Sequence, residues 1–230
     1  MCGRGEVDYT AAKIVNAFRQ AFGAELDVQL DLSVPRRNVV PSAKVPVLQR
    51  VDGRFVLADQ RWGAGMYNGE PIVLTRSERL LNGQYERLAR GLVAFTKFYE
   101  WQGEKPNKIP YAVRDKEGAV LMLAALCMRE VTANGEVREG CRVVTQPALG
   151  PLTAIHERMP VLVSPDHLAR WFDAASTRSA MAAVLPDQFR ISAALEVYVE
   201  DPLVAAGLKA SAPARTRRNP STPGSQGTLF

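Results

Sequence analysis

The chain has 230 residues, of which 47% are hydrophobic, enough for a sizeable core in one large domain or two small ones. No apolar run approaches the roughly 20 residues that cross a bilayer, and the first residues lack a signal-peptide pattern. The three cysteines show no pairing pattern, which is typical of a reducing compartment. These features argue against a membrane protein and predict a soluble, cytoplasmic protein.

The net charge of +5 is concentrated at the C-terminus. No acidic residue follows Asp201, and the last residues contribute +4 through Lys209, Arg215, Arg217 and Arg218. Only about +1 remains for the rest of the chain, so a nucleic-acid surface there would have to be a local patch.

The first half of the chain predicts a helix and then strands. Apolar residues recur at helical spacing over 9–22, which indicates an amphipathic helix. A proline-rich loop follows and leads into a strand near 45–50, and 51–62 is predicted as a hairpin that turns at Asp52-Gly53. Helical periodicity returns over 77–91, where Ser77 would cap the helix and Gly91 would stop it.

The second half is dominated by strand patterns. They are GLVAFTKFYEW, PYAVRD, AVLMLAALCMRE and CRVVTQPA, within 91–148. Short helices are predicted over 165–175 and 181–185, and a late pair of strands over 189–201. Helices around antiparallel-type strands indicate an α+β domain. The tail is rich in Pro, Ser, Arg and Gly and is predicted to be disordered.

A cysteine occupies the second position. Removal of Met1, expected before a small residue, would leave Cys2 with an amine and a thiol on adjacent carbons. The amine has a pKa near about 8, and the thiolate is a strong nucleophile. A 1,2-aminothiol condenses with an aldehyde and closes a thiazolidine ring, which an internal cysteine cannot do. Taken alone, the position favours an incidental residue at a frayed chain end.

Two further residues are candidates for proton transfer. Glu100 ends a predicted strand between Tyr99 and Trp101, where partial desolvation would make it a better proton acceptor. His156, one of two histidines, lies in IHERMP and could shuttle protons near neutral pH. A surface glutamate and a loop histidine are the alternatives. His167, on a predicted amphipathic helix, is assigned a structural role.

Arginines on connecting segments suggest a nucleic-acid groove. Arg36, Arg37 and Arg76 lie on such segments, near the aromatic residues Trp62 and Tyr67. Arginines that hold phosphates and aromatics that stack on bases would suit a single strand. Solvated surface charge is the alternative.

No metal site or cofactor is predicted. The cysteines and His156 lack the paired spacing of zinc ligands. Cys127, in AALCMRE, is typical of a buried small hydrophobe. The chain also lacks a glycine-rich phosphate loop.

Six stretches together resemble the SRAP family of SOS-response-associated peptidases, or abasic-site processing proteins. They occur in family order: MCGR at 1–4, RNVVPSAKVPV at 37–47, RWG at 61–63, TRSE at 75–78, FYEW at 98–101, and TQPA with IHERMPVLVSP within 145–165. Each stretch is weak alone, but their joint order and spacing are specific. The resemblance covers roughly residues 1–200.

This resemblance implies a β-rich domain over 1–205, with mainly antiparallel strands in a barrel-like core flanked by helices. It also implies a monomer that is associated with the nucleoid. It implies that Cys2 forms a thiazolidine crosslink with abasic sites in single-stranded DNA and so shields these sites. The protein would also have some lyase activity. Glu100 would orient the amine and shuttle protons, and His156 would assist ring opening and reversal. The predicted DNA contacts, which include the aromatic residues named above, are Arg4, Asn38, Trp62, Tyr67, Arg76, Glu78, Trp101, Thr145 and Arg158.

Three departures from the family pattern occur. Leu74 stands where the family usually has asparagine. The segment after Gly63 is short and lacks the usual tryptophans, so Met66 or Tyr67 would have to wedge between bases. The C-terminal family contacts have no clear match in 191–202.

The tail, taken as 206–230, ends in QGTLF. This ending resembles the bacterial sliding-clamp-binding motif, and the clamp is therefore a predicted partner, held by Gln226, Leu229 and Phe230. Two other functions remain open at this point. One is a thiol peptidase that uses Cys2 with His156, and the other is a noncatalytic DNA-binding module tethered to the clamp.

Overall fold

The computed structural model describes residues 3–8, 11–22, 26–30, 36–131 and 134–201. Cys2, the predicted disordered tail and its clamp motif therefore lie outside the described residues. Within the described part of the chain, no helix is long and apolar enough to cross a membrane.

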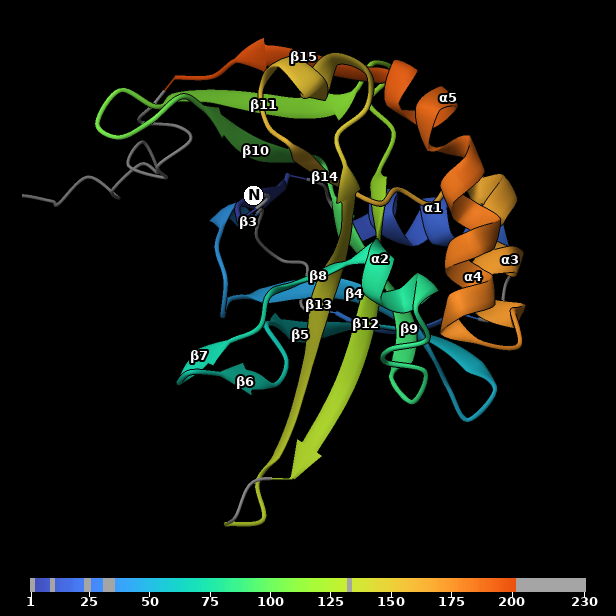
Figure 1. Cartoon of the computed structure of the whole chain (residues 1–230). Helices are drawn as coiled ribbons and strands as arrows, with labels where there is room; N and C mark the ends of the chain where they lie inside the picture. Colours follow the sequence, from blue (N-terminus) through green and yellow to red (C-terminus); the bar gives the residue numbers. More distant parts are fainter. Residues whose placement is uncertain (1–2, 9–10, 23–25, 31–35, 132–133, 202–230) are drawn as a thin grey trace, which may run out of the picture.

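Five strands close into a barrel, which confirms the predicted barrel-like core (Figure 1). They are β4 (Lys44–Val51), β5 (Arg54–Trp62), β9 (Ala89–Phe95), β12 (Leu121–Val131) and β13 (Val137–Pro147). Antiparallel pairing runs from β5 through β4, β9 and β12 to β13. A short parallel contact between β13 and β5 closes the ring, with Gly140 opposite Arg61.

Shorter strands extend the barrel at its edges. The strands β2 (Leu26–Gln29) and β8 (Leu74–Arg76) run parallel to β5 and β13, whereas β14 (Arg158–Pro160) is antiparallel to β13. The strands β6 (Met66–Tyr67) and β7 (Glu70–Pro71) form a separate hairpin. The strands are thus mainly antiparallel, as predicted, with parallel pairing at β2, β8 and the barrel closure.

A second, fully antiparallel sheet carries the FYEW stretch. Its order is β15-β11-β10-β1-β3. The strands are β1 (Gly5–Val7), β3 (Arg36–Val39), β10 (Lys97–Gln102), β11 (Ile109–Asp115) and β15 (Leu195–Val199). The first strand of the chain therefore lies directly beside β10.

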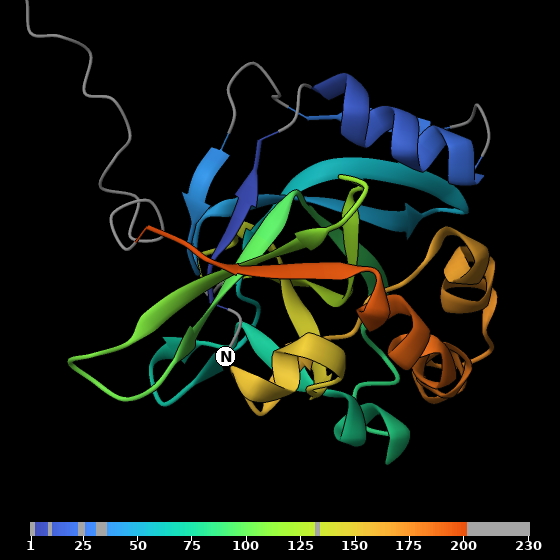
Figure 2. The ribbon, with the colours of Figure 1, turned by 90° about the horizontal axis from the view of Figure 1, so that it is seen from above.

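Helices flank the barrel on two sides (Figure 2). The first, α1 (Ala11–Phe22), buries Ile14 and Phe18 completely. The helices on another side are fixed to the barrel in part by Trp171, whose indole N–H donates to the Gly91 carbonyl over 3.1 Å. The remaining helices are α2 (Ser77–Leu81), α3 (Leu168–Asp173), α4 (Thr177–Val184) and α5 (Gln188–Ala193), with 3-10 turns η1 (Gly150–Ala154), η2 (Pro165–His167) and η3 (Leu185–Asp187).

The predicted helix over 77–91 is wrong beyond its first turn. It ends at Leu81, and the chain then turns with positive φ at Gly83 and Tyr85. Ser77 is not the cap, because Arg76 occupies that position without a side-chain capping bond. Gly91 lies inside β9, where an added Cβ would sit 2.5 Å from the Cys127 sulfur. Close approach between strands therefore requires this glycine.

Other predictions had mixed outcomes. The early helix and the Asp52-Gly53 hairpin are confirmed, and both turn residues have positive φ, at 47° and 79°. GLVAFTKFYEW is two strands, β9 and β10, separated at Thr96. The predicted late strand pair is instead helix α5 followed by β15.

Candidate functional site

Glu100 is fully buried on β10, with a relative exposure of 0%. It lies opposite Tyr111 of β11 in the antiparallel register. Burial raises the pKa of the Glu100 carboxyl to about 7, against the opposing influence of the Lys108 charge. A carboxyl with this pKa can both accept and donate a proton near neutral pH.

The first described residues of the chain lie against β10. The amide of Tyr99 donates to the Arg4 carbonyl over 3.1 Å, and Gly5 is opposite Phe98 in the strand register. The Arg4 guanidinium donates to the Asn38 side-chain oxygen over 2.6 Å and lies 5.6 Å from the Trp101 ring centroid. The structure thus brings together three predicted DNA contacts, Arg4, Asn38 and Trp101. Of these, Arg4 is two residues from Cys2 along the chain.

His156 lies between η1 and β14, and local backbone contacts orient its ring. Its amide donates to the Leu152 carbonyl over 3.0 Å, and its Nδ1 accepts from the Arg158 amide over 2.9 Å. Because Nδ1 is an acceptor, the neutral ring carries its proton on Nε2. Burial lowers the pKa of His156, which favours this neutral form.

A side-chain bridge connects the strand of Glu100 with the segment of His156. Gln102 donates from Nε2 to the Ala154 carbonyl over 2.6 Å and accepts from the Tyr111 hydroxyl over 3.1 Å. Sequence analysis missed Gln102. Its position two residues after Glu100, on the same face of the strand, was the available signal.

Arg158 and Glu78 form a bidentate ion pair between β14 and α2. Arg158 Nη2 also donates to the Thr145 carbonyl over 2.8 Å. The hydrogen bond from Arg158 lowers the pKa of Glu78 to about 2. Glu78 is therefore a fixed negative charge at neutral pH, and it holds Arg158 in one orientation.

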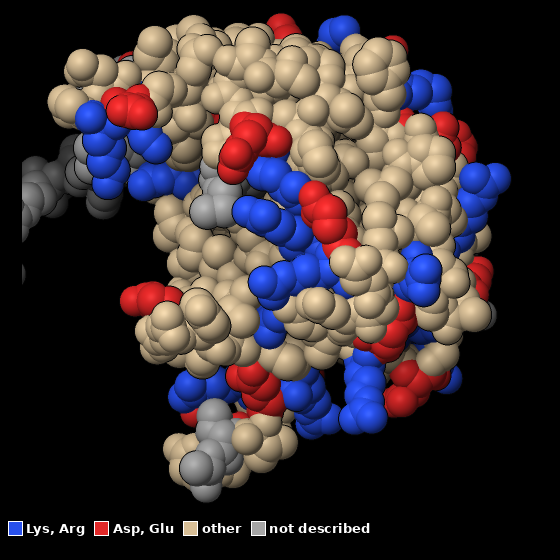
Figure 3. All heavy atoms as spheres, viewed as in Figure 1, with Lys and Arg blue, Asp and Glu red and all other residues tan. Residues whose placement is uncertain are grey.

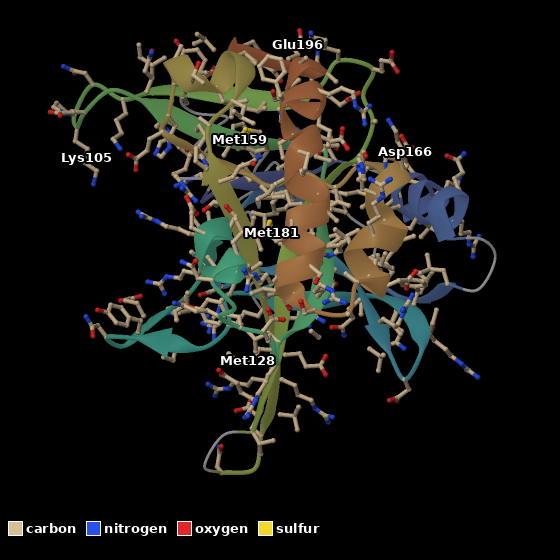
Figure 4. All side chains as sticks on the ribbon, turned by 45° about the vertical axis from the view of Figure 1, so that its right-hand side comes forward. Lys105, Met128, Met159, Asp166, Met181 and Glu196 are labelled. Carbon is tan, nitrogen blue, oxygen red and sulfur yellow. The ribbon has the colours of Figure 1, made fainter. Side chains whose placement is uncertain are left out.

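Exposed cations are concentrated on the face that carries α2, β8 and β14 (Figure 3). We call this surface the basic face and define it by Arg76, Arg79 and Arg158. Arg76 and Arg79 are exposed, whereas the Arg158 side chain is 11% exposed. A second group lies in the loop between β10 and β11, from which the side chain of Lys105 projects (Figure 4).

Two residues predicted to contact DNA, Trp62 and Thr145, have buried side chains. Trp62 is completely buried, packs against Phe95 at 5.6 Å between ring centroids, and donates its indole N–H to the Val73 carbonyl. Its ring cannot stack on a base in this structure. Thr145 is buried, with its hydroxyl donating to the Thr75 carbonyl. The prediction for Thr145 came from its position in a motif, and that for Trp62 also from its aromatic ring near arginines. Neither signal carries information on burial.

Tyr67 is placed quite differently from Trp62. With Met66 it is exposed on the β6–β7 hairpin, at 72% and 60% respectively. Large apolar side chains with this exposure are available to an outside ligand.

The internal cysteines and His167 are occupied in structural roles. Burial raises the pKa of Cys127 to about 12 and that of Cys141 well above its ordinary value, so neither is a ready nucleophile. His167 contacts Ser164 and Asp187 at 2.9 and 2.6 Å. Among the residues that the structure describes, no group of three or more His, Cys, Asp or Glu side chains is arranged to hold a metal ion.

Comparison with known proteins gives a consistent assignment. The model of the SOS response associated peptidase (SRAP) family matches residues 1–205. The chain is 26% identical over 179 residues to the abasic site processing protein YedK of Escherichia coli, covering 74% of this chain and 79% of that protein. It is 25% identical over 154 residues to the abasic site processing protein YoaM of Bacillus subtilis, covering 62% and 68%.

Solved structures share the fold. A phage-related protein of Bordetella bronchiseptica superposes with a TM-score of 0.68 at 25% identity, covering 86% of this chain and 94% of that one. A protein from Bacteroides thetaiotaomicron superposes with a TM-score of 0.67 at 18% identity, covering 89% and 98%. The second likeness concerns the fold alone.

Proposed function

Because the chain belongs to the SRAP family, we propose that it processes abasic sites in DNA by forming a covalent bond to them through Cys2. The relatives named for abasic-site processing support the substrate class. The observation that carries the proposal is Glu100, a buried carboxyl with a pKa of about 7, on the strand against which the N-terminal segment lies.

The start of the described chain lies beside the strand that carries this carboxyl. Cys2 is two residues from Arg4, whose carbonyl is bonded to the amide next to Glu100. A segment of two residues spans at most about 7 Å, and the proposal requires the Cys2 nucleophile to act within that reach of Arg4. Loss of Met1 would then place a free amine and thiol in this region.

The reaction begins when the Cys2 amine attacks the aldehyde carbon of the ring-opened sugar. Glu100 accepts a proton from the amine and returns it to the departing hydroxyl, which leaves as water and gives an imine. The Cys2 thiolate then adds to the imine carbon, the nitrogen takes up a proton, and a thiazolidine ring closes. One water is released overall. His156, with its proton on Nε2, would assist opening of the sugar ring.

The basic face and the β6–β7 hairpin suit a single DNA strand. Arg76 and Arg158 would contact phosphates, and exposed Tyr67 would stack on or wedge between bases. The ion pair with Glu78 would keep Arg158 from changing orientation when the strand binds.

The test is a denaturing gel with single-stranded DNA that holds one abasic site. The mature protein should give a slower, denaturation-resistant band, and Cys2→Ser should give none. Protein that keeps residues ahead of Cys2 retains the thiol but not the amine. It should also give none, whereas a thiol peptidase would not require the amine. A mature preparation that gives no band would overturn the proposal.

A further inference from the structure

Glu6 is a second buried carboxylate, and it lies on the first strand of the chain. Its relative exposure is 6%, although it is only four residues from Cys2. The mechanism above gives it no role. A buried charged side chain requires compensating contacts, because desolvation otherwise disfavours it strongly.

Those contacts come from β10. The Tyr99 hydroxyl donates to Glu6 Oε2 over 2.7 Å, and the Lys97 ammonium is 3.4 Å from the same oxygen. Lys97 also contacts Glu200, beyond β15, at 3.3 Å. Glu6, Lys97 and Tyr99 therefore join β1 to β10 through side chains on the face of the sheet opposite to Glu100.

The backbone of β1 is restricted at the same place. The Thr96 amide donates to the Glu6 carbonyl over 2.8 Å. An added Cβ on Gly5 would lie 2.6 Å from the Phe95 ring. The strand is thus packed against Phe95 of β9 at Gly5 and is held to β10 by the contacts of the Glu6 carboxylate.

We infer that the contacts of Glu6 with Tyr99 and Lys97 are a positioning device, which fixes β1 so that the N-terminal aminothiol meets Glu100. Glu6 is a positioning residue and does not touch the reacting atoms. The inference rests on the proposed function, because it assigns Glu6 a part in the same reaction. A charged contact suits this task because it specifies one register of β1 against β10, which apolar contacts alone define less well.

The variants are chosen to separate positioning from general stability. Glu6→Gln and Tyr99→Phe each remove one side of the contact while keeping the side-chain shape. Glu200→Gln is the matched control, since it neutralises a carboxylate on the same lysine without touching β1. Two measurements are made on each variant: the crosslinking rate at saturating abasic-site DNA, and the hydrogen exchange of the amides of residues 5–7.

Glu6→Gln and Tyr99→Phe should slow crosslinking by about 10- to 100-fold, the effect of a displacement near 1 Å. DNA affinity, measured with Cys2→Ser added to each variant, should stay the same. Amide exchange of β1 should become faster in both variants and remain unchanged in Glu200→Gln. A purely structural role would instead lower affinity and rate together.

Three outcomes would overturn the inference. They are a joint loss of DNA affinity and rate in Glu6→Gln, unchanged β1 exchange in Glu6→Gln, and an equal loss of rate in Glu200→Gln. Failure of the proposed function is a separate result. In that case the wild-type protein forms no crosslink, while the exchange measurement still decides whether Glu6 fixes β1.

Discussion

The end of β10 and the start of α2 each present a glutamate, and the two carboxyls have opposite pKa shifts. Glu100 is fully buried, and burial raises its pKa to about 7. Glu78 is 48% exposed, and its bond to Arg158 lowers its pKa to about 2. One environment gives a group that exchanges protons at neutral pH, and the other gives a permanent charge. The same residue type is thereby suited to proton transfer in one region and to holding an arginine in the other.

The largest expected effect is on the reaction rate of Glu100→Gln. An amide of the same shape cannot accept the amine proton, so crosslinking should slow by about 100-fold or more. In the wild type the rate should rise with pH through about 7, because Glu100 must be ionised to act as a base. The variant should lose this inflection. A Glu100→Gln variant that keeps it would show that another group, such as the amine or His156, controls the rate.

The next effect is on stability, and its sign follows from the same carboxyl. The pKa of Glu100 rises from 4.5 to about 7 on folding, so the folded state binds more protons between these values. Stability should therefore fall as pH rises through this window. Glu100→Gln should be more stable than the wild type at pH 8, by up to about 3 kcal/mol, and nearly equal at pH 4. Denaturant unfolding at both pH values measures this, and a variant less stable at pH 8 would contradict it.

The smallest effect is expected at the ion pair. The low pKa of Glu78 contributes stability above pH 4.5, and this is lost as pH falls toward about 2. Because Glu78 is half exposed, Glu78→Gln should cost only about 0.5–1 kcal/mol at pH 7. Crosslinking should keep its pH inflection near 7, while affinity for single-stranded DNA falls modestly as Arg158 loses its orientation. Loss of the inflection in this variant would show that the two regions are not independent.

Strand patterns and turn signals predicted most of the fold because they are local. The Asp52-Gly53 turn and the continuous apolar run at the start of β12 are examples. The helix over 77–91 failed because the chain turns at Gly83 and Tyr85, and because its last residues belong to β9. There Gly91 packs against Cys127 and Leu48, a contact that is seen only in three dimensions. Closure of the barrel between Arg61 and Gly140 has no local signal at all.

The candidate site was predicted mainly as a set of residue types, and partial desolvation of Glu100 was the one environment predicted. Sequence alone indicated Glu100 and His156 as proton-transfer groups, and burial supplies the pKa shifts that such roles need. The sequence could not distinguish Trp62, which is buried in the core, from Tyr67, which is exposed on a hairpin. Glu6 carried no motif, so only its contacts with Tyr99 and Lys97 indicate its importance.

The parallel contact that closes the barrel has a consequence for how the protein folds. It joins Arg61 to Gly140, residues separated by 79 positions in the chain. Contacts this distant in sequence form slowly, since a long loop must close before they contribute any stability. The segments paired to β13 include β8 and β14, which carry Arg76 and Arg158. A nascent chain should therefore complete its hairpins first and assemble the basic face only when the ring closes.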